Sequence, residues 1–321
     1  MATHQNPNFF NILSESNNLT KSHSRHFLAL SVLFILPFSF SLTSFPLLQT
    51  LILTSPHIPQ SKTLIQFHLS SNQIPPTLKP IIFYIIYALT LLTLYLCATS
   101  TITYSIYHGF YGRPVKLVFA IKSLFNSLIR LFVTLFCALI IVLLCGISVG
   151  LIEFGVISGI EFLGFEIEYS SIYGECFKWF DHVMLGLGLL WLCVNWVLAP
   201  VIVVVEQSWG LEPLRRSVYL VKGMRGVVVC LMLYFGLMLW LPVFGSWDTS
   251  PGSGVSVVKI VCASALLMFF LPHSLTANAI LYMNCKALHG ELAGEIVEEF
   301  AREYVTLPFG EEKVPHLVSI A

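Results

Sequence analysis

Six long apolar stretches dominate the chain, and few charged residues interrupt them. They cover residues 27–54, 81–105, 131–152, 182–205, 227–244 and 257–283. An α-helix needs about 20 such residues to cross roughly 30 Å of hydrocarbon, where lipid offers the backbone no hydrogen-bond partner. The pattern therefore predicts an all-α fold, a polytopic transmembrane helical bundle with six spans.

Prolines and a lysine modify three of these predicted spans. The first stretch contains Pro37 and Pro46 and is longer than the hydrocarbon layer. We expect a kink at Pro37, because proline cannot donate a hydrogen bond within the helix, and an end of the span near Phe45. The fifth stretch has Pro242 close to its end. The sixth carries Lys259 at its outer edge, where the long side chain can extend toward the headgroups.

The composition supports a membrane protein. Hydrophobic residues make up 56% of the chain and charged residues 11%, whereas soluble domains carry roughly 25% charged residues. The formal net charge is zero, which gives no basis for binding nucleic acid. The eight cysteines include no close C-x-x-C pair, so nothing indicates a zinc or redox site, and no cofactor is expected.

The distribution of Lys and Arg predicts the orientation in the membrane. Cytosolic loops hold an excess of these residues, and here they gather in the N-terminal tail and in the loops after the second and fourth spans. The loop between the third and fourth spans is acidic instead. Both termini are therefore expected in the cytosol, so that the glycosylation sequence Asn18-Leu19-Thr20 is never used. We expect a multi-pass protein of the endoplasmic reticulum, another endomembrane or the plasma membrane.

This topology divides the chain into three parts. Residues 1–26 form a cytosolic N-terminal tail, residues 27–283 the membrane domain, and residues 284–321 an acidic cytosolic C-terminal tail. The first apolar stretch exceeds the about 7 to 15 residues of a signal-peptide core, so we expect it to remain as an anchor.

Two cytosolic loops, near residues 113–130 and 211–223, have the periodicity of amphipathic interfacial helices. Each leads into a span, and residues 12–21 show a fainter version, which suggests a threefold unit of one surface helix and two spans. Three roles are open for their basic residues: setting the topology, attracting anionic lipid at about 1 kcal/mol each, or docking protein partners. The candidate lipid-surface contacts are Lys116, Lys122, Arg130, Arg215, Arg216 and Lys222.

Several short segments carry a resemblance to a known family. They are EQSWGLEPLRRS at 206–217, ANAILY at 277–282, CKALH at 285–289 and YVTLP at 304–308. These segments resemble a plant family of six-span membrane proteins that has no agreed biochemical role. More distantly, that family resembles the membrane domain joined to some bacterial glycerophosphodiester phosphodiesterases. The resemblance implies a fold and a membrane location, and no activity, because the phosphodiesterase barrel is a separate domain.

Polar groups at membrane depth are costly, which makes Asn195, Glu206 and His273 candidate intramembrane sites. Glu206 lies at the inner boundary, and an ion pair with Arg215 or Arg216 that fixes the surface helix is favoured over substrate or proton handling. Asn195 is expected in the middle of its span, where a hydrogen bond to a neighbouring helix is favoured over ligand binding. His273 follows a proline, and a kinked packing site is favoured over a proton or ligand site.

Enzyme motifs such as H-E-x-x-H, a Walker-type loop or an EF-hand are missing from the sequence. The first hypothesis is therefore a non-enzymatic membrane protein that organises lipid or protein partners through its basic surface helices. The alternative is a small-solute or lipid transporter or channel that uses Asn195 and His273. It is less favoured because transporters usually carry broken helices or several polar groups at the midplane. A membrane-embedded lipid enzyme comes third, because no acid, base and nucleophile cluster together.

Overall fold

The structure is a computed structural model that describes residues 8–22, 24–53, 78–111, 117–162, 172–247, 253–292, 294 and 297. All regular elements in these ranges are helices. In chain order they are α1 (Phe9–Ser22), α2 (Ser24–Leu30), the π-helical turn η1 (Ser31–Ile35), α3 (Leu36–Leu53), α4 (Leu78–Phe110), α5 (Leu117–Phe162), α6 (Ile172–Trp196), α7 (Ala199–Val205), α8 (Glu212–Leu220), α9 (Arg225–Gly245) and α10 (Gly254–Leu288).

Within the described ranges, six helical stretches are long and apolar enough to cross a membrane. These candidate spans are Ser24–Thr50, Pro80–Phe110, Phe119–Ile160, His182–Val205, Arg225–Gly245 and Gly254–Leu288. Each overlaps one stretch predicted from the sequence. The prediction of an all-α bundle with six spans is therefore confirmed in helix length and composition.

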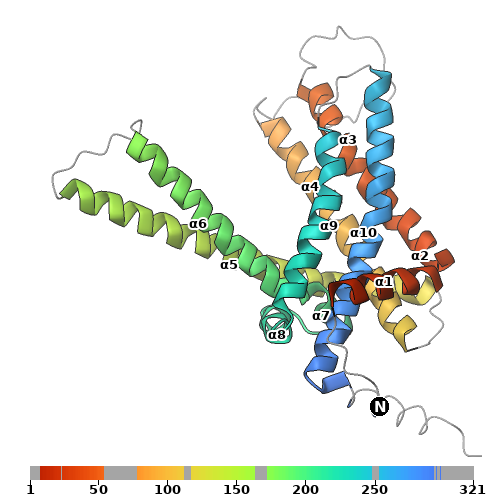
Figure 1. Cartoon of the computed structure of the whole chain (residues 1–321). Coiled ribbons are helices and arrows are strands. Elements are labelled where there is room, and N and C mark those ends of the chain that lie inside the picture. The colour runs from red at the N-terminus through yellow and green to blue at the C-terminus, as the bar shows by residue number, and fades with distance from the viewer. Residues whose placement is uncertain are drawn as a thin grey trace, which may run out of the picture.

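Four helices, α3, α4, α9 and α10, stand side by side as a bundle (Figure 1). Helices α1, α7 and α8 lie at one end of it, which we call the base. The N-terminal helix and the end of α10 are both found there. Helices α5 and α6 leave the base as a hairpin that splays away from the other four helices (Figure 1).

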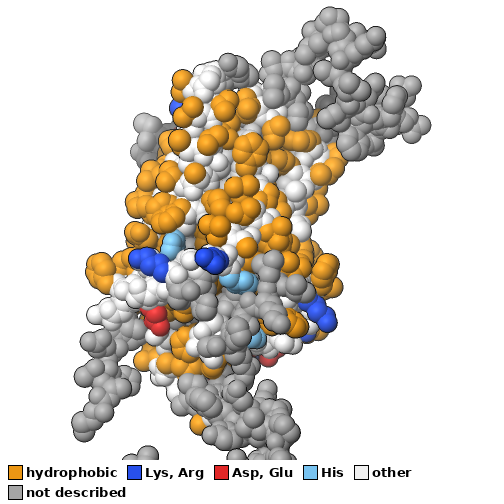
Figure 2. All heavy atoms as spheres, turned by 90° about the vertical axis from the view of Figure 1, so that its right-hand side faces the viewer, with side chains coloured by type: hydrophobic (Ala, Val, Ile, Leu, Met, Phe, Trp, Pro, Cys, Tyr) orange, Lys and Arg blue, Asp and Glu red, His pale blue; other side chains and the backbone are white. Residues whose placement is uncertain are grey.

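Apolar side chains cover the outside of the molecule. On the hairpin, for example, Leu143, Ile147 and Leu187 are all exposed. Figure 2 shows a wall of hydrophobic side chains above the base, with Lys and Arg side chains near its lower edge. Such a surface is unfavourable in water but suits a hydrocarbon layer whose headgroups lie level with the cations.

The first span contains a local irregularity at its first proline. The π-helical turn Ser31–Ile35 comes just before Pro37. It includes Leu33, whose carbonyl Pro37 cannot hydrogen-bond because proline has no amide hydrogen. The irregularity expected at Pro37 takes this local form.

The same span continues farther than the sequence predicts. Helix α3 runs through Pro46 to Leu53 and does not end near Phe45. The ring of Phe45 packs against Tyr84 and Tyr87 of α4, with ring centroids 6.1 Å and 5.2 Å apart. This packing holds α3 against its neighbour, so that the hydrogen bond lost at one proline does not end the helix.

Helix α5 is one helix of 46 residues, roughly 69 Å long at 1.5 Å per residue. Its first part packs against the base through buried side chains that recur every three or four residues, namely Ala120, Leu124, Ser127, Leu131 and Thr134. The remainder extends into the hairpin. The segment predicted as a surface helix near 113–130 and the third span are thus continuous, because no proline or glycine lies between residues 117 and 145.

The second half of α10 is enclosed on all sides. From Leu271 to Lys286 most of its side chains are buried, and α1, α3, α4, α7, α8 and α9 all contact α10. A helix buried on every face is the central helix of a packed core. The three helices of the base, α1, α7 and α8, therefore all pack against α10.

Candidate functional site

The fourth span is broken near its end, and the break brings polar groups to the base. Helix α6 ends at Trp196 and α7 begins at Ala199. Pro200 lacks the amide hydrogen that a continuous helix would use, and it is well suited to the first turn of a new helix. At this break the backbone carbonyl of Asn195 accepts a hydrogen bond of 2.6 Å from the hydroxyl of Ser217 on α8.

Asn195 lies within the fourth candidate span, His182–Val205, one residue before the end of α6. Its buried side chain donates from Nδ2 to the carbonyl of Trp191 at 2.7 Å. Its Oδ1 accepts a hydrogen bond of 3.4 Å from Nη2 of Arg225, the first residue of α9. Together with the bond from Ser217, these contacts join α6 to α8 and α9.

A tight turn holds Glu206 at the end of α7. Gln207 and Gly210 have φ angles of 55° and 75°, in the left-handed region that favours glycine. Helix α5 contacts this turn twice: Arg130 donates to Oε1 of Gln207 at 3.3 Å, and the hydroxyl of Thr134 accepts from the amide of Gly210 at 3.2 Å. The chain then enters α8 in a fixed direction.

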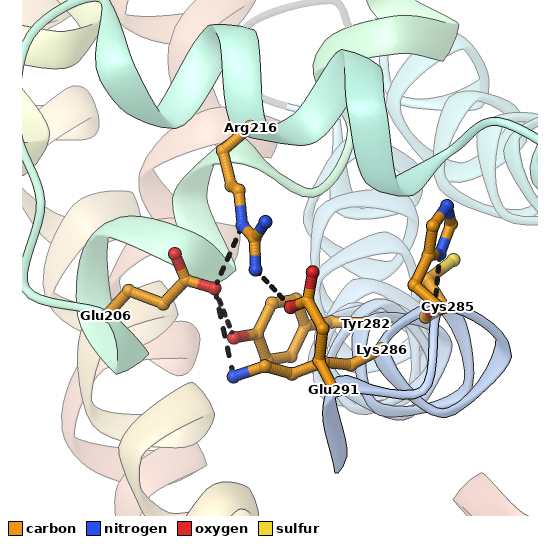
Figure 3. A network of polar contacts seen from close by, with 7 residues as sticks. Glu206, Arg216, Tyr282, Cys285, Lys286 and Glu291 are labelled. Carbon is orange, nitrogen blue, oxygen red and sulfur yellow. Dashed lines mark hydrogen bonds and ion pairs between the residues drawn. The ribbon is translucent and has the colours of Figure 1, made fainter. Parts of the chain in front are cut away.

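The carboxylate of Glu206 is the centre of a polar network that joins α7, α8 and α10 (Figure 3). The hydroxyl of Tyr282 donates to Oε1 of Glu206 at 2.8 Å. Nε of Arg216 lies 3.5 Å and Nζ of Lys286 lies 3.9 Å from the same oxygen. Arg216 also forms an ion pair with Glu291, which follows α10. We call these five residues the base network.

Lys286 is the member whose burial costs the most free energy. Its side chain is 5% exposed, whereas that of Glu206 is 23% exposed. A buried ammonium costs several kcal/mol unless an opposite charge compensates it, and the carboxylate of Glu206 supplies that charge. The ring of Tyr282, with its centroid 5.5 Å from Nζ, adds a cation–π contact.

Arg216 bridges two carboxylates. Partial burial alone would lower the pKa of Arg216, but the hydrogen bond to Glu291 and the charge of Glu206 outweigh burial and raise that pKa above its ordinary value. The guanidinium therefore stays charged, and its planar shape lets it serve both acceptors. It also lies 5.8 Å from the ring centroid of Tyr219.

His273 lies where α10 meets α1. The hydroxyl of Ser16 donates to the carbonyl of His273 at 3.4 Å, and the imidazole packs 5.0 Å from the ring of Phe269. The residue also borders a pocket of about 550 Å³ between α1, α9 and α10, whose lining includes Phe10 and Tyr234. Its side chain therefore faces the contact between the N-terminal helix and the bundle.

A second pocket beside His273, of about 500 Å³, lies between α1, α2 and α10. We call it the α1 pocket. Its polar lining consists of Asn17, Thr20, Lys21, Ser24, Ser31 and His273, and its apolar lining of Phe27, Leu28, Ala265, Met268, Phe269 and Pro272. The pocket thus offers a cation, hydroxyl groups and an imidazole next to an apolar wall.

The remaining candidate residues lie outside the base network. Lys122, Arg215 and Lys222 are exposed on α5, on α8 and directly after α8. Lys116 lies outside the described residues. These three exposed cations are therefore not members of the base network.

The sequence interpretation did not connect Tyr282, Lys286 and Glu291 with Glu206. Tyr282 and Lys286 are four residues apart on α10, and this spacing already places both on one helix face. Their partner is 76 residues away from Tyr282 along the chain. Sequence spacing gives no information about contacts at that separation. Lys21 is one of the basic residues of the N-terminal tail, and its place in the α1 pocket follows from the structure alone.

One pattern in the sequence has the letters of a hydrolase motif. Residues 146–150 read G-I-S-V-G, and a G-x-S-x-G nucleophile requires a turn between a strand and a helix. Here the segment lies inside α5, and the hydroxyl of Ser148 donates to the carbonyl of Cys145 at 2.7 Å. The local structure is therefore not that of a nucleophile elbow.

Metal ligation finds no support in the part of the chain that the structure describes. There, no three His, Cys, Asp or Glu side chains come together as ligands. The two carboxylates of the base network already face cations. What the base can do chemically is hold its helices together by charge and present cations, hydroxyl groups and pockets to small or lipid molecules.

Taken together, the apolar helices and the charged base define the class: this is a polytopic α-helical membrane protein. The chain belongs to the family described as "Domain of unknown function (DUF8558)", whose model matches residues 3–311. None of the curated proteins and none of the solved structures compared with the chain matches it. The resemblance to a plant six-span family and to a phosphodiesterase membrane domain stays a prediction.

The base network generates a prediction about stability. Glu206→Gln is expected to lower the free energy of unfolding by about 2 kcal/mol, because the neutral amide no longer offers the buried Lys286 ammonium the charge of the Glu206 carboxylate. The loss is smaller than for a fully enclosed pair because water reaches part of the carboxylate. The midpoint of thermal unfolding in detergent micelles measures it. The control Lys222→Gln, at an exposed site, should change stability by less than about 0.5 kcal/mol.

A double variant shows whether the loss of stability comes from the broken ion pair or from a nonspecific disturbance of packing. Glu206→Gln combined with Lys286→Met removes both charges and should recover most of the lost stability, since an uncharged pair carries no desolvation cost. A double variant no more stable than Glu206→Gln alone would contradict the assigned role of Glu206.

Proposed function

We propose that this protein is a non-enzymatic integral membrane protein that binds anionic phospholipid at the cytosolic face of an endomembrane or the plasma membrane and so organises lipid there. The observation that carries the proposal is the α1 pocket, where a lysine and several hydroxyl groups meet an apolar wall. A phospholipid has the same combination, because its charged headgroup adjoins hydrocarbon.

The order of residues along the pocket matches this ligand. Helix α10 runs toward the base, so His273 is nearer the base than Ala265. Helix α2 runs the opposite way, so Ser24 is nearer the base than Leu28. A headgroup phosphate would lie between Lys21, Ser24 and His273, and an acyl chain would continue along the apolar side chains toward the middle of the bilayer.

The exposed residues around the base support the same function. Lys122, Arg215 and Lys222 add positive charge near the headgroups, at about 1 kcal/mol of attraction each for an anionic surface. The aromatic side chains of Phe125 and Trp209 are exposed near these cations, and aromatic side chains favour the membrane–water interface. Protein partners that recognise the same surface are a second use of these side chains.

Two observations support a cytosolic base. The N-terminal helix and the end of α10 lie at the same end of the bundle (Figure 1), as an even number of spans requires. The cations of α1, α5, α8 and α9 lie at that end too, and basic side chains are retained on the cytosolic side.

A second candidate function, lipid or solute transport, has support from the break between α6 and α7. Discontinuous helices form the substrate sites of many transporters. The break lies at the base, however, and its polar group Asn195 is already hydrogen-bonded. Anionic lipid binding is therefore favoured.

Lipid binding can be tested with the purified full-length protein. In nanodiscs of phosphatidylserine and phosphatidylcholine, native mass spectrometry should show preferential retention of phosphatidylserine. Lys21→Gln should reduce that preference about fivefold, as expected when one basic residue worth about 1 kcal/mol is lost. Lys259→Gln, at the opposite end of α10, serves as the control and should leave the preference unchanged. An undiminished preference in Lys21→Gln would refute the assignment of the α1 pocket.

Glycosylation in microsomes tests the orientation. The native acceptor Asn18 should carry no sugar, because the N-terminal tail is cytosolic. Glu168→Asn creates an acceptor two residues before Ser170, in the loop between the third and fourth spans, and this site should be modified. Sugar on Asn18 would reverse the assigned orientation.

Lipid flipping in reconstituted vesicles tests the transport alternative. We expect vesicles that contain the protein to flip a fluorescent lipid no faster than empty vesicles. Flipping well above this background, lost in Asn195→Ala or His273→Ala, would favour transport over lipid binding.

A further inference from the structure

A third cavity, distinct from the α1 pocket, lies inside the bundle where α6 passes into α7. It has a volume of about 310 Å³ and is lined from α4, α6, α7, α9 and α10. The lining residues used below are Thr99, Thr103, Cys193, Trp196, Met232 and Asn278. The volume is at the lower end of the range for ligand sites, about 300 to 1,000 Å³.

The hydroxyl group of Thr103 distinguishes this cavity from a simple packing gap. Two nearby threonines of α4 donate to the carbonyl four residues earlier, Thr99 to Tyr95 at 2.9 Å and Thr101 to Cys97 at 2.8 Å. Ser100 also lacks a partner in the part of the chain that the structure describes, but it does not line the cavity. Thr103 is 1% exposed, and its hydroxyl has no hydrogen-bond partner among the described residues. A buried polar group without a partner is costly, so a missing hydrogen-bond partner is indicated.

Asn278 supplies a second polar group to the lining. It lies on α10, and its side-chain amide forms no hydrogen bond within the described part of the chain. An amide offers both donors and an acceptor. Both side chains are therefore able to hydrogen-bond a hydroxyl group that enters the cavity.

The lining limits the chemistry of the ligand. It contains no Lys, Arg, His, Asp or Glu, so a charged group would be desolvated there without compensation. Most of the remaining wall is apolar, including Val197, Val201, Met232 and Leu275. The ligand that fits has an uncharged polar end and a hydrocarbon body.

The position of the cavity supplies a route of entry. Cys193 belongs to the lining and is also exposed, so the cavity reaches the surface of α6. At this point the hairpin leaves the bundle (Figure 1), and Cys193 belongs to the candidate span His182–Val205. A molecule dissolved in the bilayer can enter sideways without crossing water.

We propose that this cavity binds an uncharged lipid through its hydroxyl group, with Thr103 and Asn278 as hydrogen-bond partners and the apolar wall against its hydrocarbon. Sterols and diacylglycerols both have this chemistry. The proposal is independent of the anionic lipid site, because the two pockets share no lining residue.

The test uses the full-length protein in detergent micelles with one of three photoreactive probes: a sterol, a diacylglycerol or a phosphatidylcholine. Cross-links are mapped by peptide sequencing. The sterol, the diacylglycerol or both should label peptides that contain Trp196 or Met232, and phosphatidylcholine should not. Labelling by one of these two probes identifies which lipid class binds. Labelling by both shows that the cavity recognises the hydroxyl group that the two classes share.

A matched pair of valine variants makes the test specific. Thr103→Val removes the hydroxyl and keeps the shape of the side chain, and it should weaken labelling about tenfold. Thr93→Val is the control, because Thr93 is exposed on the same helix and bonds to the carbonyl of Leu89 at 2.7 Å. It should label like the natural protein.

Thermal unfolding without lipid shows whether a folding defect, and not a lost hydrogen bond, explains weaker labelling of Thr103→Val. Thr103→Val should unfold at the same temperature as the natural protein or a higher one, because it removes an unpaired buried hydroxyl. Equal labelling of Thr103→Val and the natural protein would overturn the proposal. So would the absence of labelling by both uncharged probes, which would leave a cavity filled by about ten water molecules at 30 Å³ each.

Discussion

The burial of one charged residue in the central helix governs how the base is built. Lys286 lies in the part of α10 that other helices surround, and its ammonium needs an opposite charge within reach. Glu206 meets this need from the end of α7, and it shares its carboxylate with Tyr282 and Arg216. Because one carboxylate serves all three, the end of α7, the start of α8 and the end of α10 are fixed relative to one another.

This constraint also explains the contrast between the two halves of α5. The first half is held by the turn that carries Glu206, through Arg130 on Gln207 and Thr134 on Gly210. The second half has no comparable polar contact with the bundle among the described residues, and its apolar side chains are exposed in the hairpin. Hydrocarbon can cover these side chains as well as protein can, so packing against the bundle gains little free energy there.

The sequence predicted the spans well because their signal is local. About 20 apolar residues in a row are sufficient evidence, whatever the rest of the chain does. An ion pair between Glu206 and Arg216 could also be anticipated, since the two residues are close in sequence and joined by a short turn. The role of Lys286 was out of reach, because its partner comes from a distant part of the chain.

Other differences arose where one local rule competed with another. A proline indicated an end near Phe45, yet ring packing with Tyr84 and Tyr87 carries α3 onward. The apolar run around Asn195 predicts one continuous span, whereas the helix breaks before Pro200 and the side chain of Asn195 bonds to Arg225. In both cases the apolar pattern predicts the position of the span, whereas the places where the helix bends or ends depend on tertiary contacts.

The pockets lie where regular helix packing is interrupted, and this follows from the same physics. Parallel spans fill the space between them with side chains, whereas a helix that crosses a bundle or breaks leaves a gap. The α1 pocket lies where α1 crosses toward α10, and the inner cavity lies where α6 gives way to α7. One gap has a lysine in its lining; the other is lined by uncharged side chains, among them Thr103 with its unpartnered hydroxyl. The side chains that line each gap therefore set the chemistry of the molecule that it can hold.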